Sequence, residues 1–287
     1  MDSSTVQDQI TAFWDVVAPG YDSPDNVAAP SSADYDHWVE ALRSVLPTPS
    51  ARVLDVGTGT GFVARIAAEL GHHVTAIDAS QAMLDASSTR NPAITFAAGD
   101  AVAPVFPAGS FDVVVSRSLL WTLREPETAF RNWYQLLRPG GRVVAVYGLS
   151  PFMPGTASGH DRDDEPGWFE RHYTPETRAA LTAMHLSDHD YLLDLAAAAG
   201  FVDVTVTPLE VVRGWETSPG SDLPYALVGY RPPHQVEAHV SPTRRLSVRR
   251  LLRALQRPRG GHHLAVLGER RTRGDTDDPA RRQGRSR

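Results

Sequence analysis

Residues 53–62 read Val-Leu-Asp-Val-Gly-Thr-Gly-Thr-Gly-Phe, and this stretch decides the fold. A short apolar run leads into glycines at 57, 59 and 61, and residues 62–70 (FVARIAAEL) continue with apolar residues at helical spacing. The pattern predicts a β-strand, a tight turn and an α-helix. Glycines at such a junction let backbone N–H groups approach a ligand at the start of the helix.

The same alternation of strand and helix continues along the chain to residue 147. Apolar runs at 52–57, 73–78, 94–100, 111–116 and 142–148 alternate with helical patterns at 62–70, 80–88 and 126–137. Two more apolar runs, at 202–212 and 225–231, favour an antiparallel pair at the edge of the sheet. We therefore expect an α/β fold: a doubly wound, Rossmann-like, mostly parallel seven-stranded sheet with helices on both faces.

The remaining segments are interpreted as additions to this core, and we expect three regions. Residues 1–48 carry two helical patterns and are predicted to form an N-terminal helical lid. Residues 49–233 form the main domain, with an insert at 148–190 after the fifth strand and helices over 175–186 and 188–199. Residues 234–287 are predicted to be a disordered tail, with contact to a membrane surface or nucleic acid as the alternative.

Composition excludes several classes of protein. The 287 residues contain no cysteine, which excludes a disulfide framework, a zinc–thiolate site and a thiolate nucleophile. No apolar run approaches the ~18 residues of a membrane span, and the polar N-terminus does not resemble a secretory signal, so we expect a cytoplasmic protein. The net charge is −6, yet the tail holds 14 Arg against 5 acidic residues. The rest is acidic, and no nucleic-acid partner is expected for it.

An acidic residue at the end of the second strand points to the kind of ligand. Asp78 lies 21 residues after Gly57. An acid about 20 residues beyond the glycine turn binds the ribose diol in nucleotide-binding α/β folds. A dinucleotide fingerprint would place its third glycine at position 62, which is Phe62 here. The residues thus predict a nucleoside-containing ligand, with a dinucleotide disfavoured and a merely structural turn as the alternative.

Taken in order, residues 53–80, 97–116 and 136–146 resemble the motifs of the class I S-adenosylmethionine-dependent methyltransferases. Within that family the chain is similar to the small-molecule type that includes the ubiquinone/menaquinone methylases, over roughly residues 8–231. The resemblance implies S-adenosyl-L-methionine as cofactor. It also implies metal-independent methyl transfer to O, N or C of a small-molecule acceptor, and leaves the oligomeric state open.

The resemblance also assigns roles to individual residues. Gly57, Gly59 and Gly61 are expected to line the methionine part of the cofactor, and Asp55 to orient that loop. Asp78 is expected to accept hydrogen bonds from both ribose hydroxyls, which are strong because the acceptor is charged.

Four further residues receive roles in the same way. Asp100 is expected to accept from the adenine amino group, with Ala101 beside it, and Ser116 to lie near the sulfonium. Tyr21 is similar to the lid tyrosine that closes over the cofactor carboxylate. Each polar residue has an alternative interpretation as a cap, a turn residue or a packing residue.

A general base is needed only if the acceptor arrives protonated. Three histidines of the insert, His160, His185 and His189, are the candidates, because imidazole is the natural proton acceptor near neutral pH. Their alternative is an ordinary solvated or packed histidine. No metal site is expected. Two rival functions stay open: a cofactor-binding protein that catalyses a non-methylating reaction such as a cyclisation, and a nucleic-acid methyltransferase that grips through the basic tail.

Overall fold

The computed structural model describes residues 2–21, 32–92, 94–149, 168–184, 186–212 and 223–233. By its contacts the chain divides into two compact units, Met1–Glu237 and Ala238–Arg287, and the second lies outside the described residues. The expected disordered tail therefore stays a prediction. Within the described part, no helix has the length and apolar character needed to cross a membrane.

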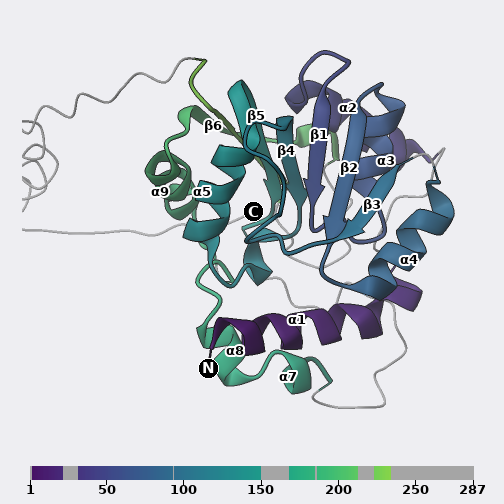
Figure 1. Ribbon diagram of the computed structural model, residues 1–287, viewed down its shortest axis with the longest axis vertical. Coiled ribbons are helices and arrows are strands. Elements are labelled where there is room, and N and C mark those ends of the chain that lie inside the picture. Colours follow the sequence, from purple (N-terminus) through teal and green to yellow (C-terminus); the bar gives the residue numbers. More distant parts are fainter. Residues whose placement is uncertain are drawn as a thin grey trace, which may run out of the picture. The chain divides into compact units, whose positions relative to one another are not determined.

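The first unit is built on a seven-stranded sheet in the order β3-β2-β1-β4-β5-β7-β6 (Figure 1). Its strands are β1 (Arg52–Val56), β2 (His73–Asp78), β3 (Thr95–Ala98), β4 (Phe111–Arg117), β5 (Leu137–Tyr147), β6 (Val202–Pro208) and β7 (Tyr225–Tyr230). The first five pair in parallel, and β7 runs antiparallel to both β5 and β6. The predicted doubly wound sheet and its antiparallel edge pair are confirmed.

Helices cover both faces of the sheet. On one face, α2 (Ala33–Val45), α3 (Phe62–Glu69) and the short η3 (Glu210–Val212) share a core with β1, β4 and β5. On the other, α5 (Pro126–Leu136) and α9 (Asp190–Ala199) pack around the buried Trp133 and Phe130. The strands are apolar on both sides for this reason: β1 and β4 contribute alternate residues to each core.

The two N-terminal helices have different positions. The first, α1 (Ser3–Val17), lies across the end of the sheet toward which the β1 and β2 arrows point, and α4 (Gln81–Arg90) packs against it (Figure 1). It buries Ile10 and Phe13 in a third core shared with α4 and α7 (Trp168–His172). The second helix, α2, packs on the face of the sheet instead. Of the two helices in the predicted lid over residues 1–48, α1 lies across the ends of the strands and α2 on a face of the sheet, and the lid itself stays a prediction.

One predicted helix is shorter than expected. The pattern over 175–186 gives only α8 (Pro175–Ala179), which is capped by the side chain of Thr174. After it the chain turns, because Leu181 and Met184 pack toward α1 while Ala183 joins the core under α5. Tertiary packing on two sides overrides the local helical preference here.

Candidate active site

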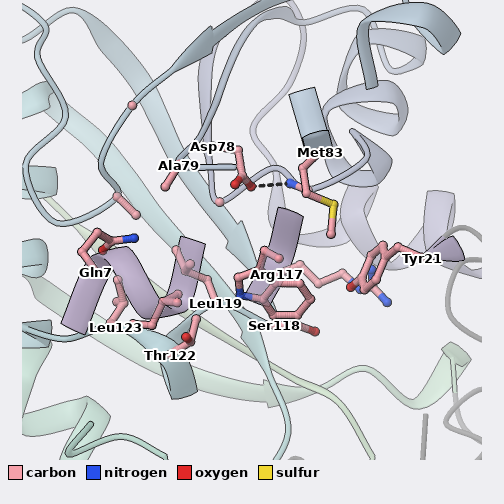
Figure 2. A pocket seen from close by; sticks show the side chains of 16 residues that line it. Gln7, Tyr21, Asp78, Ala79, Met83, Arg117, Ser118, Leu119, Thr122 and Leu123 are labelled. Carbon is pink, nitrogen blue, oxygen red and sulfur yellow. Dashed lines mark hydrogen bonds between the residues drawn. The ribbon is translucent and has the colours of Figure 1, made fainter. Parts of the chain in front are cut away.

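A pocket opens where the carboxyl ends of β1, β2, β3 and β4 meet, and its empty volume is about 680 Å³ including the open mouth. The strand order reverses between β1 and β4, which is the topological switch point where open α/β sheets bind ligands. The pocket is lined by Gln7, Ile10, Trp14, Tyr21, Gly57, Gly59, Asp78, Ala79, Met83, Gly99, Ala101, Arg117, Ser118, Leu119, Thr122 and Leu123. Figure 2 shows Asp78 between Gln7 at one end and Tyr21 at the other.

The glycine loop forms the pocket floor with two of its three glycines. Gly57 and Gly59 both have positive φ, +66° and +56°, a conformation that favours glycine. A Cβ at Gly57 would lie 2.6 Å from Leu119 Cδ1, so glycine is also needed for close packing there. A Cβ at Gly59 would meet only Tyr21 Cε1, at 4.0 Å, and would enter the pocket. Gly61 is the N-cap residue just before α3 and is not a lining residue.

Asp78 presents its carboxylate to the pocket from the end of β2. Its Oδ2 accepts from the Gly59 N–H at 2.8 Å and its Oδ1 from the Ser80 N–H at 2.9 Å. Burial raises the pKa of Asp78, while these backbone hydrogen bonds oppose the shift. The helix α1 is tied to the same place, since Asp15 Oδ1 accepts from Ser80 Oγ at 2.6 Å.

Asp55 lies beneath the loop and is only 1% exposed. Thr58 Oγ1 donates to Asp55 Oδ2 at 2.7 Å, which links the end of β1 to the turn above it. Burial raises the pKa of Asp55 to about 7. Asp55 is not a lining residue, so its place agrees with a loop-orienting role rather than with ligand contact.

Asp100 follows β3 as expected, but its carboxylate is engaged elsewhere. Arg124 Nη1 donates to Asp100 Oδ1 at 2.9 Å, and Arg124 Nη2 donates to Oδ2. This ion pair and nearby backbone donors hold the pKa of Asp100 below its ordinary value. Ala101 lines the pocket, and its carbonyl accepts from the indole N–H of Trp133 at 2.8 Å. Asp100 itself is not a lining residue.

The end of β4 brings one cation to the pocket. Arg117 lines it, with its guanidinium carbon 4.8 Å from the ring centroids of both Trp38 and Phe62. Ser118 has a positive φ of 53°, which places the backbone after the strand in an uncommon conformation. Ser116 is 1% exposed and, as the neighbour of Arg117 in the strand, points to the opposite face of β4. Its hydroxyl has no hydrogen-bond partner in the described part of the chain. Ser116 is not a lining residue.

Tyr21 reaches the pocket from the end of η1 (Ala18–Gly20). Its ring meets Trp14 edge-on, with centroids 5.7 Å apart. Burial raises the pKa of Tyr21, and the positive charge of Arg117 opposes that rise. The phenol is therefore protonated at neutral pH and can donate a hydrogen bond.

Of the three candidate bases, the structure describes His189. Its Nδ1 shares a hydrogen bond of 2.7 Å with the hydroxyl of Tyr147, at the end of β5. Its ring also lies 4.5 Å from that of Tyr225, centroid to centroid. His189 is partly buried and is not among the residues that line the pocket. His160 and His185 lie outside the described residues.

Sequence reasoning missed the contribution of α1 to the pocket wall. Gln7, Ile10 and Trp14 all line it. Their spacing puts them on one face of a helix, and a polar residue within that otherwise apolar stripe was the available signal. The contacts of Arg124 carried no such signal, because they join residues far apart in the sequence.

The fold and pocket define a doubly wound α/β protein with a ligand site at the switch point. Residues 54–145 match the family model described as a methyltransferase domain. The demethylmenaquinone methyltransferase of Renibacterium salmoninarum is 38% identical over 152 residues, which cover 51% of this chain and 62% of that protein. The chain thus spans less than two thirds of the length of this relative.

Solved structures show the same fold. The [4+2]-cyclase SpnF superposes with a TM-score of 0.56 at 18% identity, covering 79% of this chain and 97% of that one. Phosphoethanolamine N-methyltransferase 2 of Haemonchus contortus, solved with S-adenosyl-L-methionine, gives 0.51 at 19% identity, covering 77% and 60%. Residues 54–145 are thus similar to a methyltransferase domain, in agreement with the resemblance that the sequence motifs carry.

Proposed function

We propose that the protein transfers a methyl group from S-adenosyl-L-methionine to O, N or C of a small-molecule acceptor. The observation that carries the proposal is the pairing of Asp78 and Gly59 in one pocket at the switch point. A carboxylate beside a glycine turn suits a ribose diol, because the carboxylate accepts from both hydroxyls while the missing Cβ leaves room for the ligand. The match to the methyltransferase domain supports the same cofactor.

The lining residues suit a ligand with an adenosine and an amino-acid end. Asp78 would hold the ribose, and Gly57 and Gly59 would hold the methionine part. Tyr21 and Arg117 would face the carboxylate and sulfonium end of the methionine part. The protonated phenol of Tyr21 can donate a hydrogen bond to the carboxylate, and its aromatic ring attracts the sulfonium cation. The cofactor, when bound, supplies a methyl group that is already activated for displacement.

The protein's own contribution is then alignment and exclusion of water. The helix α1 forms one wall of the pocket through Ile10 and Trp14 and is anchored by Asp15 on the start of α4. This arrangement supports a lid that closes the pocket from the side opposite the glycine loop. His189, held by Tyr147, is our candidate for the base that takes a proton from an acceptor, and His160 and His185 stay candidates on the sequence alone.

Calorimetry tests the cofactor step. We expect the purified full-length chain to bind S-adenosylmethionine and S-adenosylhomocysteine with micromolar affinity and not to bind NADH. Binding of NADH alone would contradict the proposal. A following assay with methyl-labelled cofactor separates the proposal from the two alternative functions. Label in a small molecule supports the proposal, and label in nucleic acid supports a nucleic-acid methyltransferase that binds through the basic tail. Conversion of the acceptor without label supports a non-methylating enzyme.

Replacing Asp78 with alanine is expected to weaken binding of S-adenosylhomocysteine by about 10- to 150-fold, the equivalent of losing a hydrogen bond to a charged group, ~1.5–3 kcal/mol. Asp85→Ala is the matched control, because Asp85 is an exposed carboxylate of α4 whose side chain accepts only from Gln81 in the described structure. Calorimetry on both variants decides. Equal affinities in Asp78→Ala and wild type would remove Asp78 from the site.

A further inference from the structure

The order of the strands gives the pocket a direction. Along it the sheet runs β3-β2-β1-β4, and lining residues follow each of these strands. This inference rests on the proposed function: with the ribose at Asp78 and the methionine part on the β1 glycine loop, the adenine lies on the β3 side, near Gly99 and Ala101. Figure 2 shows Gln7 and Leu123 at one end of the same pocket, away from Tyr21.

The carboxylate expected to recognise the adenine is already engaged by other donors. Asp100 accepts from two nitrogens of Arg124, one at each carboxylate oxygen, and from the Val102 N–H at 2.8 Å. An ionised carboxylate offers about four lone-pair sites, so these three donors occupy most of them, and the guanidinium lies against both oxygens. Displacing the guanidinium would exchange a two-pronged ion pair for a single hydrogen bond from a neutral amino group. Asp100 also lies outside the pocket lining.

Arg124 connects this carboxylate to the lid helix. The same Nη1 that bonds Asp100 also donates to Gln7 Oε1, and the Arg124 Nε donates to Ser3 Oγ at 2.9 Å. Because a guanidinium only donates, the amide oxygen of Gln7 must face it. Gln7 Nε2 donates to Thr11 Oγ1 at 3.2 Å, which fixes the other side of the amide.

Gln7 lines the pocket with an oriented amide, and its partners among the described residues leave it one lone pair and one N–H. A carboxamide of this kind pairs with adenine, which presents an amino donor beside a ring-nitrogen acceptor. Hypoxanthine presents a carbonyl instead of the amino group, so pairing with it would need the amide to turn its oxygen away from Arg124.

We propose that Gln7 is the residue that recognises the adenine base, and that Asp100 is a positioning residue that acts through Arg124. The base is thus read by the lid helix rather than by the loop after β3. This makes the lid part of ligand selection as well as of closure.

The test compares S-adenosylhomocysteine with its hypoxanthine analogue, S-inosylhomocysteine, by calorimetry. Wild type is expected to prefer the adenine ligand about tenfold or more, as expected for a paired base edge. Gln7→Leu should reduce that preference to about twofold or less. Gln9→Leu is the matched control, because Gln9 lies on the same helix and bonds Thr177, yet it does not line the pocket. That variant should keep the wild-type preference.

A double-mutant comparison separates Gln7 from Asp100. Asp100→Ala should lower the adenine preference in wild type but add nothing in the Gln7→Leu background, because it acts through Gln7. A full further loss there would mean that Asp100 reads the base directly. Two results with a wild type that binds both ligands would overturn this inference and leave the proposed function standing. In the first, Gln7→Leu keeps the preference for the adenine ligand. In the second, wild type itself has no such preference. If wild type binds neither ligand, the proposed function itself fails.

Discussion

Gly59→Val is expected to abolish binding of S-adenosylhomocysteine, a loss of at least about 100-fold, or ~2.7 kcal/mol. A Cβ at Gly59 has no neighbour within 4 Å except Tyr21, so a branched side chain there projects into the space that we assign to the ligand. The backbone at Gly59 has φ +56°, which adds strain for any L side chain and more for a β-branched one. Calorimetry measures the loss, and circular dichroism checks that the variant is folded.

Gly109→Val is the control for that strain. Gly109 has φ +71°, its nearest neighbour for an added Cβ is the Arg138 Cα at 3.9 Å, and it is not a lining residue. Both variants should lose a similar amount of stability, ~1–2 kcal/mol for one residue in the left-handed region. Only Gly59→Val should lose the ligand. Tight binding by a folded Gly59→Val protein would show that the loop is structural and that the ligand lies elsewhere.

The second large effect concerns pH and stability. Burial raises the pKa of Asp55 from 3.8 to about 7, so between these values the native state holds a proton that the unfolded state releases. The stabilisation that Asp55 contributes should then be complete below about pH 4, fall as pH rises, and be lost above about pH 7. The whole span is worth about 4 kcal/mol at 1.36 kcal/mol per unit, and the part between pH 5 and pH 8 about 2–3 kcal/mol.

Urea unfolding of wild type and Asp55→Asn at about pH 5 and pH 8 measures this contribution. The asparagine cannot ionise, so the variant should lack this fall of ~2–3 kcal/mol. Asp112→Asn is a control of opposite sign: Asp112 pairs with Arg52 and Arg138, which lower its pKa, so it stabilises at neutral pH and loses that effect in acid. An unchanged pH profile in Asp55→Asn would show that Asp55 ionises normally in the folded protein.

Local sequence was sufficient for the elements and their order. The period of apolar residues changes from about 2 to 3.6 at each junction, and the glycine turn at 57–61 can be read from its spacing alone. The positions of Gly57, Gly59 and Asp78 in the pocket followed, because parallel strands bring their carboxyl ends to one edge of the sheet. The predicted length of the helix over 175–186 was wrong, because local helical preference could not show that this segment packs on two sides.

The sequence did not predict which groups the polar side chains bond. Asp100 follows its strand as predicted, yet its carboxylate is bonded by Arg124, which also bonds Gln7, more than a hundred residues before that arginine. The hydrogen bond between His189 and Tyr147 likewise joins residues that are 42 positions apart in the sequence. Sequence determined the strands, the turn and the acid at the end of β2, because backbone conformation and burial depend on near neighbours. Tertiary structure alone decided which donor occupies which acceptor, because each carboxylate and amide has few lone pairs and distant residues compete for them.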